Sequence, residues 1–151
     1  MRQQFSDALK QAMKAGDKRR VSTVRLITSA LKDRDIEQRG AGKEPLSDDE
    51  ILGLLTKMVK QRQESMKIYE DNARPELAEQ EREEIAIIMG FMPQQMDDAQ
   101  VAAAIDAVVV ETGATGMRDM GKVMAVLKER HAGQMDFGKA SAAIKARLSA
   151  G

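Results

Sequence analysis

Residues 117–148 read MRDMGKVMAVLKERHAGQMDFGKASAAIKARL, and they specify a helical hairpin more clearly than any other part of the chain. Apolar residues recur with the spacing of one helix face at Met117, Met120, Met124 and Leu127. Gly133 suits the left-handed position that follows a helix end, and Asp136 suits the N-cap of the next helix. We therefore expect two short helices joined by a tight turn.

Gly121 lies inside the first helix of this hairpin, where a glycine costs about 1 kcal/mol relative to alanine. A glycine at such a position is typical of a site where a neighbouring backbone approaches closely. We expect Gly121 to lie where the helices cross, with Met120 and Met124 in the core. The neighbouring Lys122 is then expected to be free to contact a partner.

The hairpin resembles the C-terminal tail shared by the YqeY family and the GatB subunit of tRNA-dependent amidotransferases. The matching residues are Gly121, Lys122, Val123 and Met124, followed by Gly133 and Asp136. Further landmarks of the YqeY family occur in the family's order, namely Val24-Arg25-Leu26, Lys60-Gln61-Arg62-Gln63-Glu64-Ser65, Glu81-Arg82-Glu83-Glu84 and Phe91-Met92-Pro93. The resemblance thus covers nearly the whole chain. GatB also has a large catalytic domain, and no segment of this sequence could form one. The chain therefore looks like a stand-alone YqeY protein.

This resemblance implies a role near tRNA, because the GatB tail helps to hold tRNA against the amidotransferase. It implies tRNA, an amidotransferase or an aminoacyl-tRNA synthetase as partners, and Lys122 as the basic residue of the shared motif. It also implies an enzymatic activity as an alternative, that of a carbon–nitrogen ligase with glutamine as amido-N-donor. Ammonia production, carboxylate activation and an ammonia channel would each need residues that the sequence does not offer.

Helical periodicity extends over almost the whole sequence, and no alternating run is long enough for a strand. Caps and breakers predict helices over residues 2–15, 17–37 and 47–71 and a fourth helix that begins at Pro75. Asp97 or Asp98 is expected to cap a fifth helix that Gly113 ends, and the hairpin follows. Pro93 is the expected joint between two domains. We expect an all-α protein with an N-terminal bundle of about four helices in residues 1–92. A small three-helix domain like the GatB tail is expected in residues 96–151.

Composition restricts the functions that remain. The 24 basic and 24 acidic side chains cancel, so the chain as a whole is no polyelectrolyte. The absence of cysteine excludes disulfides, thiol nucleophiles and thiolate metal sites. Neither a signal peptide nor an apolar run of about 18 residues occurs, so we expect a cytoplasmic protein without a membrane segment. Charge is unevenly spread, at a net +6 over residues 1–43 and −6 over residues 44–90.

A basic stripe is expected on the second helix. It consists of Lys18, Arg25, Lys32 and Arg39, which recur every seven residues with Ser22 and Ser29 between them. At helical spacing these residues share one face, away from the core face of Val24, Ile27 and Leu31. Such a row of cations suits phosphates, and the absence of interleaved aromatics predicts binding by backbone and shape. The alternative is a solvated helix face, whose field Asp33 and Asp35 would weaken.

No catalytic constellation is visible. His131 is the only histidine, and it continues the face of Met124 and Leu127 at a helix end. The glutamates of residues 76–84 spread around their helix, which favours a solvated acidic face or pairing with the basic N-terminal helices over a metal site. There is no phosphate-binding loop, dinucleotide fingerprint or zinc spacing. We expect no catalytic residue, metal or cofactor.

Three functions stay open at this point. The first is a tRNA-associated accessory binding protein without catalysis of its own. The second is a helical protein–protein adaptor without nucleic acid, using the methionine-rich or acidic faces. The third is the carbon–nitrogen ligase activity, for which the family resemblance is the only argument. The sequence leaves the oligomeric state open.

Overall fold

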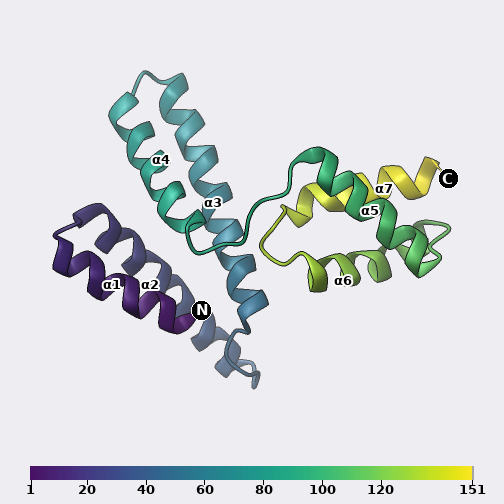
Figure 1. The fold of residues 1–151 in the computed structure, drawn as a ribbon, viewed down its shortest axis with the longest axis horizontal. Coiled ribbons are helices and arrows are strands. Elements are labelled where there is room, and N and C mark those ends of the chain that lie inside the picture. Colours follow the sequence, from purple (N-terminus) through teal and green to yellow (C-terminus); the bar gives the residue numbers. More distant parts are fainter. Residues whose placement is uncertain (151) are drawn as a thin grey trace. The chain divides into compact units, whose positions relative to one another are not determined.

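Helices form the regular structure of residues 1–150, the part of the chain that the computed structural model describes (Figure 1). The elements are α1 (Arg2–Ala15), α2 (Lys18–Gly40), α3 (Asp48–Asp71), α4 (Pro75–Met89), α5 (Asp98–Thr112), the 3₁₀ turn η1 (Met117–Asp119), α6 (Met120–Arg130) and α7 (Phe137–Ala150). No strand occurs among these residues. The expectation of an all-α protein is therefore confirmed.

Local signals in the sequence explain where α2, α3 and α4 begin. Asp17 caps α2, because its carboxylate accepts a hydrogen bond from the Arg20 N–H at 3.1 Å. Ser47 and Glu50 form the expected capping box at the start of α3. Pro75 occupies the first turn of α4, where its missing N–H would have had no helical partner.

The ends of α2 and the start of α5 add detail to the expected boundaries. α2 continues to Gly40, almost one turn beyond the expected end at Glu37. Asp97, and not its neighbour Asp98, caps α5. Its carboxylate accepts the Gln100 N–H at 2.8 Å, while the Gln100 side chain accepts the Asp97 N–H at 2.9 Å.

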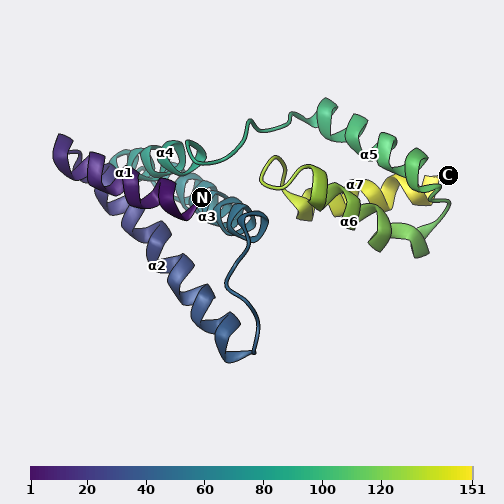
Figure 2. The same cartoon turned by 60° about the horizontal axis from the view of Figure 1, so that its bottom comes forward.

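Contacts divide the chain into two compact units, of which the first is Met1–Pro93 and the second begins at Gln94. In the first unit α1 and α2 form one antiparallel pair, α3 and α4 form another, and α2 packs on α4 (Figures 1 and 2). Its largest fully buried side chains are Phe5, Val24, Ile27, Ile51, Leu55 and Ile88. Leu46, in the loop before α3, is also buried and joins this core.

The second unit packs α5, α6 and α7 together around a core of its own. The core residues include Ile105, Val108, Val123, Leu127, Ala140 and Ile144. The turn between α6 and α7 is tied to the segment that leads into α5. The Met96 N–H donates to the Gln134 carbonyl at 2.9 Å, and the Gln95 amide donates to the Gly133 carbonyl at 2.6 Å.

The hairpin of α6 and α7 has the expected turn. Gly133 is left-handed with φ 75°, which suits glycine because it has no Cβ. A carboxylate oxygen of Asp136 accepts the Gly138 N–H at 2.8 Å, as an N-cap side chain does. Both predictions for the turn are confirmed.

Two expectations for α6 are wrong. Met117 lies in η1 before the helix and is 42% exposed, so it is not part of the core face. An added Cβ on Gly121 would meet no atom within 4 Å, so no backbone approaches it closely. The reason is that α6 packs through Val123 and Leu127, which are fully buried, while Met124 is half-buried at the edge of this face.

Candidate nucleic-acid interface

The basic stripe of α2, defined by Lys18, Arg25, Lys32 and Arg39, is exposed along its whole length. A heptad rises about 10.5 Å along a helix and drifts by about 20°, so the four residues form a nearly straight row. The opposite face carries Val24, Ile27 and Leu31, which are buried in the first unit. Burial of that face fixes the stripe toward solvent.

The stripe differs from the other basic residues of α2 in its lack of ionic partners. Arg19 pairs with Glu83 of α4 at 3.1 Å, and Arg34 pairs with Glu37 at 3.5 Å. The Arg20 guanidinium lies 5.7 Å from the centre of the Phe91 ring. Within residues 1–150, by contrast, no carboxylate forms an ion pair with any of the four stripe residues.

Asp35 is one of the two acidic residues expected to weaken this positive field, and its carboxylate is bonded to Arg2 and Leu46. Its carboxylate accepts two hydrogen bonds from the Arg2 guanidinium, at 2.7 and 3.0 Å, and one from the Leu46 N–H at 3.0 Å. These bonds, first that of Arg2 and then that of Leu46, hold the pKa of Asp35 below its ordinary value. The charge of Arg39 also lowers the pKa of Asp35, by a smaller amount. Asp33 is exposed beside the stripe.

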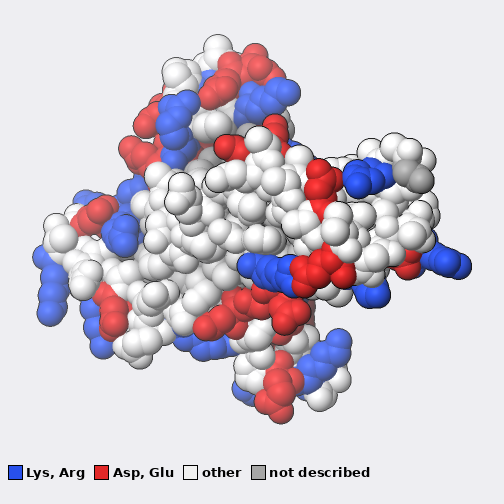
Figure 3. Space-filling view, turned by 45° about the vertical axis from the view of Figure 1, so that its right-hand side comes forward, with Lys and Arg blue, Asp and Glu red and all other residues white. Residues whose placement is uncertain are grey.

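One face of the molecule shows how surface charges of both signs are distributed. On the face drawn in Figure 3, lysines and arginines are interspersed with aspartates and glutamates, which agrees with the neutral total. Lysines and arginines therefore do not form a field of one sign on this face.

Lys122, the basic residue of the shared tail motif, has a structural contact. Its ammonium donates a hydrogen bond to the Thr112 carbonyl at 3.3 Å, at the C-terminal end of α5. A cation there also complements the helix dipole. The side chain is exposed, so it lies at the surface of the second unit and ties α6 to α5.

Two arginines of the second unit, Arg130 and Arg147, are paired across helices. Arg130 forms a bidentate ion pair with Glu111, with one contact at 2.6 Å, and Arg147 contacts Asp106 at 3.0 Å. Lys128, Lys139 and Lys145 are exposed, and no ion pair within the described part of the chain involves them. The motif residues Gly121, Met124, Gly133 and Asp136 belong to the helices and the turn of this unit.

The acidic residues of α4 are more involved in packing than the sequence indicates. Glu84 is only 7% exposed and accepts a hydrogen bond from Arg62 of α3 at 3.0 Å. Partial burial, and then the charge of Glu84, raises the pKa of the neighbouring Glu81. The expectation of a wholly solvated acidic face is thus wrong at Glu84, whereas the alternative of pairing with basic helices holds for Glu83 and Glu84.

Residues 1–150 contain no group of three or more histidine, aspartate or glutamate side chains placed to hold a metal ion. His131 is half-buried at the end of α6, and its Nδ1 lies 3.0 Å from the side-chain oxygen of Gln134. No helix in the described part of the chain is both long and apolar enough to cross a membrane.

These features define the class of protein: an all-α chain of two helical units, in which α2 exposes a row of cations that form no ion pair within residues 1–150. The sequence profile described as "Yqey-like protein" matches residues 2–148. The chain belongs to this family, which confirms the resemblance found in its sequence.

Similar curated proteins carry the name "Altered inheritance of mitochondria protein 41, mitochondrial". The protein from Eremothecium gossypii is 29% identical over 145 residues, which cover 94% of this chain and 77% of that protein. The protein from Lachancea thermotolerans is 30% identical over 68% of this chain and 54% of its own length. One from Saccharomyces cerevisiae is 29% identical over 70% of this chain and 58% of its own. The chain thus spans between about half and three quarters of these relatives.

These names contradict the expectation of a cytoplasmic protein, since each of the three relatives is named as mitochondrial. That expectation rests on the lack of cysteine and of a secretory signal. Both features point to a reducing environment, but neither distinguishes the cytoplasm from other reducing compartments.

Proposed function

We propose that this protein is a tRNA-associated accessory binding protein without catalysis of its own. The observation that carries the proposal is the row of Lys18, Arg25, Lys32 and Arg39, exposed on one face of α2 and without ion pairs in residues 1–150. Membership of the Yqey-like family supports it, because the tail of this family resembles the tRNA-binding tail of GatB.

The two units have different parts in this proposal. The four helices of the first unit form a scaffold that presents the stripe to the RNA backbone. The second unit acts as a GatB-like tail that lies against tRNA, or against an amidotransferase or aminoacyl-tRNA synthetase that holds it. Lys122, Lys128, Lys139 and Lys145 are the lysines that this unit exposes.

The stripe suits a phosphate backbone and not a base sequence. Phosphate contacts by lysine and arginine position a nucleic acid without reading it. Successive cations about 10.5 Å apart along α2 match a chain of regularly spaced anions better than a single compact ligand. Ligase activity is not part of the proposal, because no described cluster of side chains would activate a carboxylate or release ammonia.

The test is binding of unfractionated tRNA to the full chain, measured by fluorescence anisotropy over a range of salt concentrations. Each phosphate contact contributes about 0.7 to 0.9 to the slope of log K against log salt. The triple variant Lys18→Gln, Arg25→Gln, Lys32→Gln should therefore weaken binding at low salt and reduce the slope by about 2 to 3.

The matched control is the triple variant Lys10→Gln, Lys57→Gln, Lys67→Gln. It changes net charge equally and alters exposed lysines of α1 and α3. Equal losses in the two triple variants would indicate attraction by net charge alone and would refute the stripe as an interface. Absence of tRNA binding at low salt would refute the proposal as a whole.

A further inference from the structure

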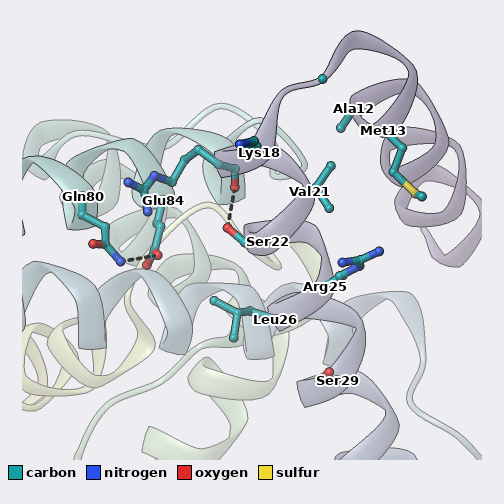
Figure 4. A pocket seen from close by; sticks show the side chains of 12 residues that line it. Ala12, Met13, Lys18, Val21, Ser22, Arg25, Leu26, Ser29, Gln80 and Glu84 are labelled. Carbon is teal, nitrogen blue, oxygen red and sulfur yellow. Dashed lines mark hydrogen bonds between the residues drawn. The ribbon is translucent and has the colours of Figure 1, made fainter.

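A groove of about 730 Å³ lies on the first unit, on the surface that α2 shares with its neighbours. α2 forms its floor, while the C-terminal end of α1 and part of α4 form its sides (Figure 4). Figure 4 shows the side chains of α2 between Met13 of α1 on one side and Gln80 and Glu84 of α4 on the other. Its size is within the range of known binding pockets.

Aliphatic side chains give the groove its apolar character. Met13 and Leu26 line it and are 56% and 44% exposed, and the half-buried Val21 lies with them. Large apolar side chains that gather in a concave, solvent-exposed site indicate contact with a partner. No aromatic ring lines the groove.

The charge that the groove offers to a partner is positive. Lys18 and Arg25, the N-terminal half of the basic stripe, line the groove and form no ion pair within residues 1–150. Glu84 also lines it, but its carboxylate is already bonded to Arg62 at 3.0 Å. Arg19 is likewise paired, with Glu83. A ligand that complements the groove therefore has apolar groups that contact the floor and negatively charged groups that contact Lys18 and Arg25.

The length of the groove fits a short helix. Its floor extends along α2 from Lys18 to Ser29, a rise of about 16 Å, or roughly three helical turns. Amphipathic helices bind to such grooves through apolar residues at i, i+3, i+4 and i+7.

From this charge complementarity we infer that the groove binds an acidic amphipathic helix of a partner protein. Apolar side chains of that helix lie against Met13 and Leu26, and its carboxylates contact Lys18 and Arg25. An RNA base is the weaker fit, because sequence-tolerant base binding depends on stacking against aromatic rings. The inference goes beyond the proposed tRNA function. Because both ligands use Lys18 and Arg25, the helix and tRNA compete for the first unit.

The test uses the full chain and a fluorescent synthetic peptide of about four helical turns. The peptide has leucines on one face, glutamates along both edges of that face, and alanine and glutamine elsewhere. A second peptide carries lysine in place of every glutamate. Binding of the acidic peptide and not of the basic one is expected, and the reverse order or no binding would overturn the inference.

The decisive variant is Met13→Gln with Leu26→Gln, which removes apolar surface without altering charge. It should weaken peptide binding at least about tenfold, because two aliphatic side chains lose their burial on binding. Ile36→Gln is the matched control, since Ile36 is 55% exposed on the same helix outside the groove. Equal losses in the two variants would overturn the inference, and circular dichroism checks that both remain folded.

The two functions separate through variants at residues that only one of the two ligands is expected to contact. Lys32→Gln with Arg39→Gln should weaken tRNA binding and spare peptide binding, while Met13→Gln with Leu26→Gln should do the reverse. If the latter variant instead weakens binding of a single-stranded oligonucleotide and leaves the peptide unaffected, the groove belongs to RNA. A failure of the helix-binding inference is therefore distinguishable from a failure of the proposed tRNA function.

Discussion

Arg62 of α3 donates from Nε to a carboxylate oxygen of Glu84 of α4 at 3.0 Å, and the two side chains are only 15% and 9% exposed. The pair bridges the α3–α4 hairpin. Arg62 also donates to the Met58 carbonyl at 3.2 Å, and the Gln80 amide lies 3.5 Å from the other oxygen of Glu84. Every member of this small network therefore has a partner, which is the condition under which buried charge is tolerated.

Loss of one member of the pair should strongly destabilise the first unit. Glu84→Ala leaves Arg62 buried without its hydrogen-bonded carboxylate, and we expect a loss of about 3 kcal/mol or more in the free energy of unfolding. Urea denaturation followed by circular dichroism measures it. Glu83→Ala is the control, because its ion pair with Arg19 is exposed and should contribute about 0.5 kcal/mol. The double variant Arg62→Met, Glu84→Leu should recover most of the loss, and a variant as unstable as Glu84→Ala would contradict this account.

Asp35 should make stability depend on pH at the acid end. Its carboxylate pKa is lowered in the folded state by Arg2 and by the Leu46 N–H. A lowered folded pKa adds stability above the unfolded pKa of about 4, and this stability is lost as the pH falls through the folded pKa. The difference in unfolding free energy between wild type and Asp35→Asn should thus be full at about pH 7 and smaller at about pH 2. Asp33→Asn is the control, and a pH-independent difference for Asp35→Asn would contradict the prediction.

Replacement of Gly133 and of Gly121 by alanine should change the stability of the protein in opposite directions. Gly133→Ala places a Cβ on a residue with φ 75°, so we expect a loss of about 1 kcal/mol or more. Gly121→Ala adds a Cβ in open space on a helical residue, and we expect a gain of up to about 1 kcal/mol. Thermal unfolding of both variants measures these effects. A destabilising Gly121→Ala would restore the idea of a close helix crossing.

Asp97 should stabilise the second unit through its capping box with Gln100. Asp97→Ala removes the side chain that accepts the Gln100 N–H, and such losses cost about 1 kcal/mol. Amide hydrogen exchange should become faster in α5 and in the helices that share its core, α6 and α7. Ser47→Ala in the capping box of α3 serves as the counterpart, with faster exchange expected within Met1–Pro93. If either variant accelerated amide hydrogen exchange equally in both units, the idea that each cap stabilises only its own unit would be contradicted.

The helices and most of their starts were predictable because their signals are local. A cap such as Ser47 with Glu50, or a breaker such as Gly133, acts on residues within one turn of itself. The exposure of the α2 stripe was predictable for a similar reason, since Val24, Ile27 and Leu31 on the same helix indicate which face is buried.

Features that depend on contacts between helices were not predictable from the sequence. The burial of Glu84, the open space at Gly121 and the bond from Lys122 to Thr112 follow from how helices pack against each other. The groove over α2 forms where the C-terminal end of α1 and the middle of α4 lie beside α2, and no local sequence pattern indicates this arrangement. Paired residues such as Arg19 and unpaired ones such as Arg25 look alike in the sequence, because only the fold places Glu83 beside one of them.

The spacing of the α2 stripe has a consequence for its self-repulsion. At physiological ionic strength the Debye length is about 8 Å, shorter than the separation of about 10.5 Å between successive cations on the helix axis. Salt therefore screens Lys18, Arg25, Lys32 and Arg39 from one another while each remains at close range to anything that touches the helix. The first unit can hold four like charges in a row at little cost in folding stability, and it keeps their full strength for a polyanion in contact.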